Sequence, residues 1–284
     1  MSIFKGDSIY KSGGGGGGFN NGGELVDGEF IAVENNTISS YDNVSRDPIN
    51  LYFEPKDGEV LNAVVELTTA VNATVNVYVV KNGFLYLLGN VGGDTVTAGN
   101  DYKINITGDS YAIENVSIPN PDPEFASLMG SIYKLVKIDN LLFLGSNFSG
   151  DTGQYVKQNG TTYYLPRSVK NLNVNGFVIP DDNDITKIET LYPYPNTGLH
   201  LKSTSGWRDG GNGDNLSGMD FKPLGYYSNY TQDITTHSYF YFKINGDNNL
   251  FYRYVCRYND NVANASSQSY VVNAYYNLRL VLRT

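Results

Sequence analysis

The sequence has little of several residue types, and each shortage excludes a class of protein. Cys256 is the only cysteine among 284 residues, so the chain cannot form an internal disulfide. Lysine and arginine number 20 against 29 aspartate and glutamate residues, which gives a net charge of −9. A chain with this acidic balance lacks the positive field that attracts nucleic acid or anionic lipid, so neither is an expected partner.

Long hydrophobic runs are missing as well. No stretch of about 18 apolar residues occurs that could span a bilayer, and the first residues lack the apolar segment of a signal peptide. We therefore expect synthesis in the cytoplasm and no membrane insertion. Charged residues make up only 17% of the chain, while glycine (31) and tyrosine (24) are abundant. This composition favours strands and turns over helices, so we expect a mainly β protein.

Residues 1–28 have the composition of an arm rather than of a folded element. Six consecutive glycines at 13–18 lose too much backbone entropy on folding to lie inside a helix or strand. A cloning linker is the alternative explanation, but the preceding residues do not resemble a purification tag. Four apolar residues before the glycines could anchor the arm on a partner: Ile3, Phe4, Ile9 and Tyr10.

Residues 29–118 alternate between apolar and polar side chains in several short stretches, which is typical of half-buried antiparallel strands. The clearest stretch is 71–79. Asn82-Gly83 follows it, and this pair between two apolar stretches is the strongest short signal of a β-hairpin. Strands at intervals of about 8 to 12 residues predict a small antiparallel β-sandwich. Three prolines in residues 119–124 then predict a linker.

Residues 125–284 are predicted to form a second domain with both strands and helices. Residues 125–136 fit a short helix or a strand, and residues 270–283 fit a strand with Leu278, Leu280 and Leu282 on one face. Asp181 precedes a stretch in which apolar residues recur at helical spacing, which predicts a capped helix. The apolar residues of this helix are Ile185, Ile188 and Leu191.

Five landmarks in this second domain occur in the order found in a known family. They are residues 137–140 with 147–148, 176–180, 201–207, 215–226 and 277–281. Their sequences resemble, in turn, the KIGNQ, GWRLP, LKS-GW, PAGY and SVRLV elements of the Fibrobacter succinogenes major paralogous domain. The resemblance extends from residue 130 to residue 284. It implies a C-type-lectin-like α+β fold and a role in display and adhesion, without enzymatic activity.

Members of this family occur on bacterial surface proteins and on virion proteins of phages that infect Bacteroidetes. A chain with such a domain and an arm, but no export signal, resembles a phage virion component. The resemblance implies a head or tail fibre or decoration protein that displays a lectin-like domain for attachment to a host glycan or receptor. The expected partners are other virion proteins, contacted through the arm, and further copies of the chain in a trimer or else a dimer. The alternative is a purely structural virion cement or adaptor protein without a host ligand.

Little in the sequence points to catalysis. His200 and His237 are the only histidines, and neither stands near a nucleophile motif or at metal-binding spacing. His200 fits a strand, and Cys256 fits a buried apolar position. We expect no enzyme and no cofactor, and a glycan depolymerase ranks third, after the two virion functions. Calcium is an open alternative to an ordinary loop at 209–220 and to helix capping at 181–184.

Aromatic residues are concentrated in residues 226–258, where asparagine, glutamine and aspartate separate them. Tyrosine rings stack on sugars, and the polar side chains match sugar hydroxyls, so this stretch predicts a glycan-binding surface. Core packing or contact between copies of the chain is the competing explanation for the aromatic residues in strands. The predicted ligand-binding residues are therefore those expected in loops: Trp207, Asp209, Asn212, Tyr227 and Tyr230.

Overall fold

The structure is a computed structural model of the 284-residue chain. It describes residues 25, 27, 30–34, 49–55, 61–67, 75–91, 102–108, 122–243, 250–257, 259–264 and 274–284. Outside the described residues lie the four predicted anchoring residues, Ile3, Phe4, Ile9 and Tyr10. The chain divides into two compact units, Met1–Tyr133 and Lys134–Thr284. The predicted linker at 119–124 stays a prediction.

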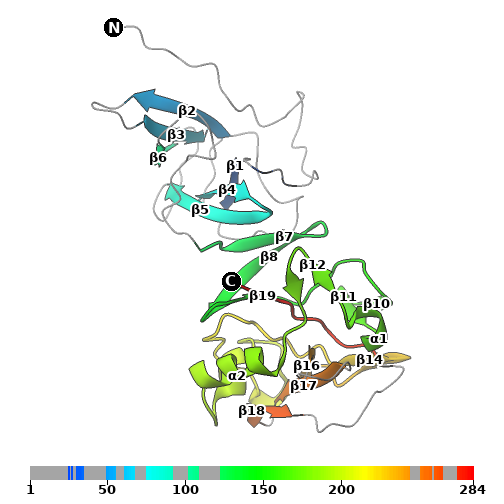
Figure 1. The fold of residues 1–284 in the computed structure, drawn as a ribbon. Helices are drawn as coiled ribbons and strands as arrows, with labels where there is room; N and C mark the ends of the chain where they lie inside the picture. Colours follow the sequence, from blue (N-terminus) through cyan, green and yellow to red (C-terminus); the bar gives the residue numbers. More distant parts are fainter. Residues whose placement is uncertain are drawn as a thin grey trace. The chain divides into compact units, whose positions relative to one another are not determined.

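The described residues of the first unit form two antiparallel sheets (Figure 1). One sheet has the order β2-β3-β6, and in the other the strands of this unit have the order β1-β4-β5-β7. The strands are β1 (Phe30–Glu34), β2 (Ile49–Pro55), β3 (Leu61–Leu67), β4 (Val75–Lys81), β5 (Phe84–Val91), β6 (Tyr102–Gly108) and β7 (Phe125–Leu128). Two antiparallel sheets are what a small β-sandwich requires.

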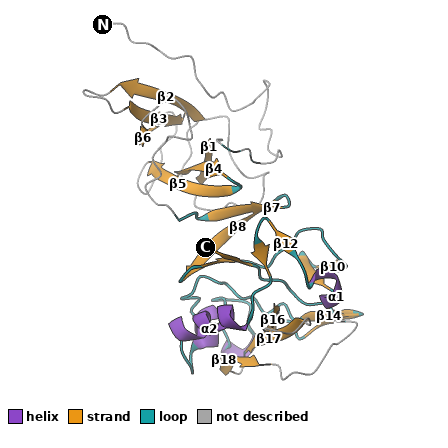
Figure 2. Cartoon of the chain, viewed as in Figure 1, coloured by secondary structure: helices purple, strands orange, loops and turns teal. Residues whose placement is uncertain are grey.

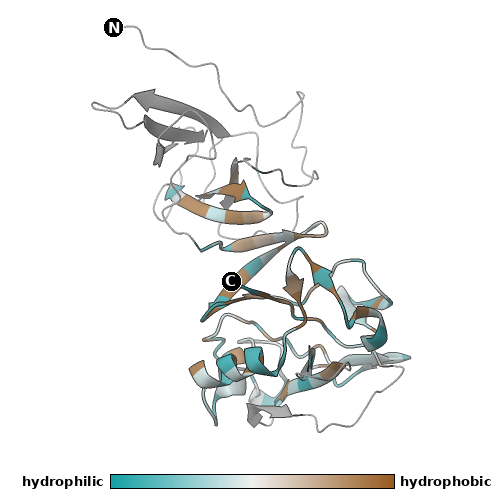
Figure 3. Ribbon diagram, viewed as in Figure 1, coloured by the Kyte–Doolittle hydropathy of each residue, from teal (hydrophilic) through white to brown (hydrophobic). Residues whose placement is uncertain are grey.

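The Asn82-Gly83 turn joins β4 to β5, as predicted from the sequence. Both residues have positive φ, 54° and 76°, which asparagine tolerates and glycine adopts without a steric penalty. The prediction that β4 is only half-buried was wrong, because residues 76–80 are all buried. Tyr78 can be buried because its hydroxyl donates a hydrogen bond to Glu124 (2.9 Å). The apolar residues of β5 give this strand its mostly brown colour in Figure 3.

Strands also dominate the described residues of the second unit, with short helices between them (Figure 2). The first half contains β8 (Ser131–Ile138), which begins in the first unit, β9 (Leu141–Leu144), β10 (Tyr155–Gln158), β11 (Thr161–Tyr164), α1 (Pro166–Val169), β12 (Asn173–Val174), β13 (Phe177–Val178) and α2 (Asp182–Leu191). The second half contains α3 (Thr197–Leu201), the 3₁₀ helix η3 (Arg208–Gly210), β14 (Tyr226–Ser228), β15 (Tyr230–Gln232), β16 (His237–Lys243), β17 (Leu250–Cys256), β18 (Asn259–Asn264) and β19 (Val281–Arg283). The expectation of a mainly β protein is confirmed.

Helix α2 confirms the predicted capped helix. Asp181 accepts hydrogen bonds from the N–H groups of Asn183 and Asp184, and the Asp184 carboxylate accepts one from the N–H of Asp181. Ile185 and Ile188 are buried, as their spacing predicts. Leu191 is 53% exposed, because it ends the helix and has turned away from the core.

Two other predictions concern strands, and the structure resolves the first and corrects the second. Residues 125–136, left open between helix and strand, lie in strands β7 and β8 with their connecting turn. Residues 270–283 were predicted as one strand, but among those described only Val281–Arg283 form a strand. Tyr275, Tyr276 and Asn277 instead make isolated bridges to three different segments of the chain. One continuous ladder cannot form when successive residues pair with different partners.

The main core of the second unit lies between α2, the β9–β19 strands and one face of β16–β17. It contains Val136, Ile138, Leu141, Phe143, Ile185, Ile188, Leu201, Trp207, Met219, Phe221, Phe240, Phe242, Val255 and Val281. Within the described ranges, no helix combines the length and the hydrophobicity needed to cross a membrane.

Candidate functional site

The sheet formed by β16 and β17 presents tyrosines on one face. Strand pairing places Tyr239 opposite Tyr254 and Tyr241 opposite Tyr252. Because alternate residues of a strand point to opposite faces, these four side chains share a face. The residues between them, such as Phe240, lie on the other face and belong to the core.

We call the aromatic cluster on this face the tyrosine shelf. Its members are Tyr226, His237, Tyr239, Tyr252, Tyr254 and Tyr276. Tyr239 is the centre of the cluster, because the ring centroids of the other five lie 5.5–5.6 Å from its own. Tyr252 and Tyr276 stack at 4.8 Å. Tyr239 and Tyr276 are buried, and the other four are half-buried, so the cluster has an outer aromatic surface.

Asp233 provides the charged group of the shelf. It lies in the turn between β15 and β16, is exposed, and its Oδ2 accepts a hydrogen bond from the Tyr239 hydroxyl (2.7 Å). Beside it, Gln232 Oε1 accepts a hydrogen bond from the Tyr226 hydroxyl, also at 2.7 Å. A carboxylate and an amide therefore border the aromatic rings, which is the combination that the sequence analysis associated with sugars.

The turn that carries Asp233 has an unusual backbone. Asp233 and Thr235 have φ values of 57° and 67°, in the left-handed region that a β-branched residue such as threonine rarely adopts. Backbone hydrogen bonds hold Thr235 on both sides: its N–H donates to the carbonyl of Pro223 (2.8 Å), and its carbonyl accepts from the N–H of Arg208 (2.9 Å). The surrounding structure thus fixes where the Asp233 side chain lies.

Gly225 is the residue that allows this turn to lie close to β14. Its φ is +63°, and a Cβ atom there would stand 1.7 Å from the carbonyl oxygen of Gln232. Gly225 also forms a parallel bridge to Ser238 in β16. Only glycine permits this approach, which brings Tyr226 onto the shelf.

Burial sets the protonation of the shelf. Burial and the neighbouring Asp233 raise the pKa of Tyr239, and burial with neighbouring tyrosines raises the pKa of Tyr276, so both stay neutral at ordinary pH. Burial lowers the pKa of His237, although Asp233 acts in the opposite direction. Tyr239, Tyr276 and His237 therefore carry no charge near pH 7.

Of the predicted ligand-binding residues, Trp207 is buried. Its indole belongs to the main core, its Nε1 donates to the Ser203 hydroxyl (3.0 Å), and the Lys202 ammonium lies 5.6 Å from the ring centroid. The ring faces are thus occupied by protein and do not form part of the exposed surface. Asn212 has a local role, because its Oδ1 accepts a hydrogen bond from the N–H of Trp207 (3.1 Å).

Asp209 is exposed and lies at φ 51° within the short 3₁₀ helix η3, which follows Trp207. Its carboxylate forms an ion pair with Arg257, and Arg208 lies 3.6 Å from the same carboxylate. The N–H of Arg257 donates to the carbonyl of Thr236 (2.9 Å). The loop that carries Asp209 and Asn212 is therefore joined to the Asp233 turn through backbone contacts.

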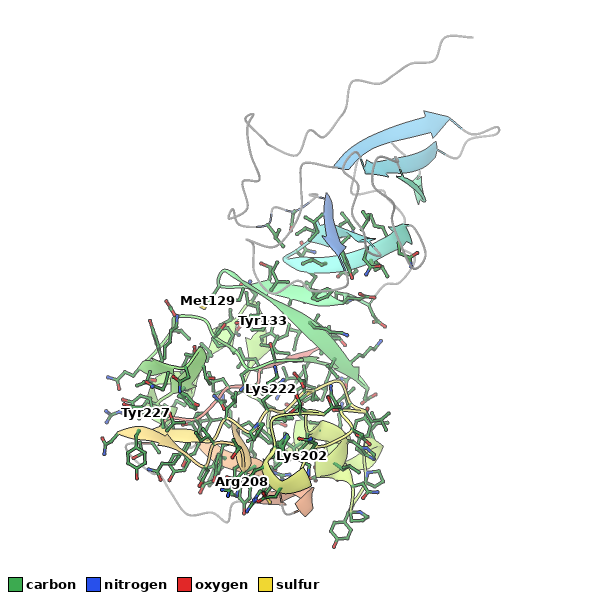
Figure 4. The ribbon with its side chains drawn as sticks, turned by 180° about the vertical axis from the view of Figure 1, so that it is seen from behind. Met129, Tyr133, Lys202, Arg208, Lys222 and Tyr227 are labelled. Carbon is green, nitrogen blue, oxygen red and sulfur yellow. The ribbon has the colours of Figure 1, made fainter. Side chains whose placement is uncertain are left out.

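Tyr227 and Tyr230 lie on the β14–β15 hairpin, and Tyr227 is labelled in Figure 4. Tyr227 is next to Tyr226 but turns away from the shelf, and its ring packs at 6.0 Å from Tyr275 and 6.4 Å from Tyr163. Tyr230 is 67% exposed. The structure thus does not bring the five predicted ligand-binding residues together in one cluster.

Among the residues considered for catalysis, His200 is paired with an acidic side chain. His200, predicted in a strand, lies in α3, where its Nδ1 is 2.8 Å from Asp214 Oδ2. Burial pushes the pKa of Asp214 upward, but the N–H of Leu216 and the ring of His200 outweigh it, and the pKa lies below its usual value. Cys256 is buried, as predicted. In the part of the chain that the structure describes, no three histidine, cysteine or acidic side chains gather as metal ligands would.

Sequence reasoning missed the residues that organise the shelf. The tyrosines of β16 and β17 were noted, but were set aside because aromatic residues in strands usually pack in a core. Asp233 carried no signal, since its position depends on the close approach at Gly225. The alternation of tyrosine with phenylalanine in 239–242 was the one readable sign that the two faces differ.

Comparison of the chain with protein-family models, with curated proteins and with solved structures finds no match in any of the three. The resemblance to the Fibrobacter succinogenes major paralogous domain therefore stays a prediction.

Proposed function

We propose that this chain is a bacteriophage virion protein, a head or tail fibre or decoration protein, that attaches to a host surface glycan or receptor through its second unit. The observation that supports this proposal is the tyrosine shelf. Its half-buried rings border an exposed carboxylate held by the Tyr239 hydroxyl. Flat aromatic faces beside a hydrogen-bonding group suit a sugar ring, which has both apolar and hydroxyl-bearing surfaces.

Attachment would use many weak contacts at once. A shallow aromatic surface binds a single sugar weakly, and several linked copies raise the overall avidity by orders of magnitude without a new contact. We propose that the glycine-rich arm, through Ile3, Phe4, Ile9 and Tyr10, docks on other virion proteins. A trimer, or else a dimer, would present several shelves on one particle.

The test is the capture of intact Bacteroidetes cells by beads that carry many copies of the full chain. The informative variant is Tyr230→Ala with Tyr254→Ala, because Tyr230 is 67% exposed and Tyr254 forms the outer surface of the shelf. Tyr194→Ala is the matched control, since Tyr194 is 80% exposed on the loop after α2. Trp207 fluorescence verifies that each variant is folded.

We expect the unmodified chain and the Tyr194→Ala control to capture cells, and the double variant to lose capture. If no host is captured by the unmodified chain at high valency, the attachment function is wrong. The cement or adaptor function would then be tested by removing the protein from particles and measuring their integrity.

A further inference from the structure

Several oxygen atoms at the edge of the shelf remain able to accept hydrogen bonds. A tyrosine hydroxyl has one proton, and the protons of Tyr226 and Tyr239 are committed to Gln232 Oε1 and Asp233 Oδ2, each at 2.7 Å. Both hydroxyl oxygens keep lone pairs, and Asp233 keeps a second carboxylate oxygen. A ligand with hydroxyl groups can therefore donate to these oxygens and can accept from the Nε2 amide group of Gln232.

The charge at this edge disfavours a negatively charged ligand. Among the described residues, no lysine or arginine forms an ion pair with Asp233. The two arginines joined to the turn by backbone contacts, Arg208 and Arg257, both lie against the Asp209 carboxylate. His237 has a lowered pKa and carries no positive charge near pH 7. An anionic ligand would meet an uncompensated carboxylate, in a chain whose net charge is already −9.

The turn that positions Asp233 has a backbone conformation that residues other than glycine rarely adopt. The φ of Asp233 is 57° and that of Thr235 is 67°. Strained backbone of this kind persists only where the surroundings fix it, and it is frequent at ligand sites. Here it keeps a carboxylate at the border of the exposed rings.

We propose that the tyrosine shelf binds an uncharged sugar ring, with its apolar face on Tyr252 and Tyr254 and with adjacent hydroxyls donating to Asp233, and that it rejects acidic sugars. This selectivity depends on the proposed attachment function and specifies its ligand. A uronic acid, sialic acid or sulfated sugar would place a negative charge near Asp233. A neutral hexose replaces water at the same acceptors without that repulsion.

Saturation-transfer NMR on the full chain tests the selectivity. The neutral probes are the methyl glycosides of glucose, galactose and mannose, and the acidic probes are the methyl glycosides of glucuronic and galacturonic acid. We expect transfer from tyrosine ring protons to at least one neutral sugar, and at least a tenfold weaker affinity for the acid that differs from it only at C6. Equal affinity for a neutral sugar and its acid, or no transfer to any neutral probe, would overturn the selectivity.

Asp233→Asn isolates the carboxylate. Asparagine tolerates the left-handed backbone and can still accept the Tyr239 hydroxyl, so the turn is expected to stay in place. We expect the affinity for the neutral sugar to fall about tenfold, because a charged acceptor is replaced by a neutral one. The variant should bind the corresponding uronic acid about as tightly as the neutral sugar. Asp151→Asn is the matched control, since Asp151 is exposed and pairs with Lys157 on another loop.

The two proposals can fail separately. In one outcome, the unmodified chain captures cells, the double variant Tyr230→Ala with Tyr254→Ala does not, and the shelf shows no preference for neutral sugars. This outcome would overturn the inference about the ligand and leave attachment intact. Binding of neutral sugars without capture of any host would contradict attachment and support the chemistry of the shelf. An unchanged ratio of neutral to acidic affinity in Asp233→Asn would remove Asp233 from the site.

Discussion

The two faces of the β16–β17 sheet are both aromatic, yet they have opposite relations to water. One face buries Phe240 and Phe242 in the main core, with Phe240 at 5.0 Å from Phe221. The other carries Tyr239, Tyr252 and Tyr254, of which the last two are half-buried. The same two strands thus contribute to a closed core and to an open surface.

The hydroxyl group accounts for the difference. Phenylalanine has no polar atom, so complete burial leaves nothing unsatisfied. Each buried tyrosine of the other face has a partner: Tyr239 donates to Asp233, and Tyr241 donates to the carbonyl of Tyr164 (3.0 Å). Rings whose hydroxyls are fixed in this way form a rigid platform with oxygen atoms at its edge. If the comparison is right, substitutions on the two faces should have different consequences.

The largest effect is expected on the core face. Phe240→Ala removes a ring that is 3% exposed and should lower the free energy of unfolding by about 3–5 kcal/mol. Tyr254→Ala should cost clearly less, because its ring already contacts water. Urea unfolding followed by Trp207 fluorescence measures both, since Trp207 is the only tryptophan and lies in this core. Equal costs would show that the tyrosine face is a second closed core.

Gly225→Ala should separate the shelf from the core. A Cβ atom at φ +63° costs about 1–3 kcal/mol in backbone strain, and it collides with the carbonyl of Gln232. We expect the Asp233 turn to move, sugar binding to be lost and the core to survive. Gly160→Ala is the control, because its φ is +75° but nothing lies within 4 Å of the added atom. Sugar binding that survives Gly225→Ala would show that the turn does not position the ligand.

Removal of single hydroxyl groups should distinguish the buried Tyr241 from Tyr239, whose hydroxyl lies at the edge of the shelf. Tyr241→Phe removes one of two hydrogen bonds to the buried carbonyl of Tyr164, which keeps the one from the N–H of Tyr276 (3.0 Å), and should cost about 0.5–1.5 kcal/mol of unfolding free energy. Tyr239→Phe frees Asp233, which water can solvate, so its stability cost should be smaller and its effect on sugar binding larger. Urea unfolding and saturation-transfer NMR on the same two variants compare the effects. The reverse order would contradict the division between buried and outer hydroxyls.

Local signals predicted the elements that depend on few residues. The capped helix α2 was readable because Asp181 and Asp184 satisfy each other's backbone groups within four residues. The Asn82-Gly83 hairpin was readable because its turn requires positive φ at two adjacent positions.

Contacts between distant segments were not readable in the same way. Residues 275–277 come directly before the alternating leucines of 278–282, but they pair with three separate segments, and no local pattern specifies those partners. Trp207 follows a glycine and precedes a polar loop, as an exposed residue would, yet its ring is buried in the main core. Asp233 reaches the shelf only because Gly225, eight positions earlier, lets two backbone segments approach. Such a site depends on tertiary packing, so the sequence predicts its aromatic composition but not its charged group.

The smallest expected effect comes from His237, at the end of the tyrosine face. Burial lowers its pKa in the folded chain below the ordinary value of 6.5, and the nearby Asp233 only partly opposes this shift. The folded state therefore binds the proton less readily than the unfolded state, so its contribution to stability is present above pH 6.5 and is lost as the pH falls below that value. We expect the urea midpoint to decrease on acidification, and His237→Gln to remove part of that decrease. An identical acid response in His237→Gln and the unmodified chain would mean that the imidazole is solvated like a surface group, and that the shelf extends only from Tyr239 to Tyr276.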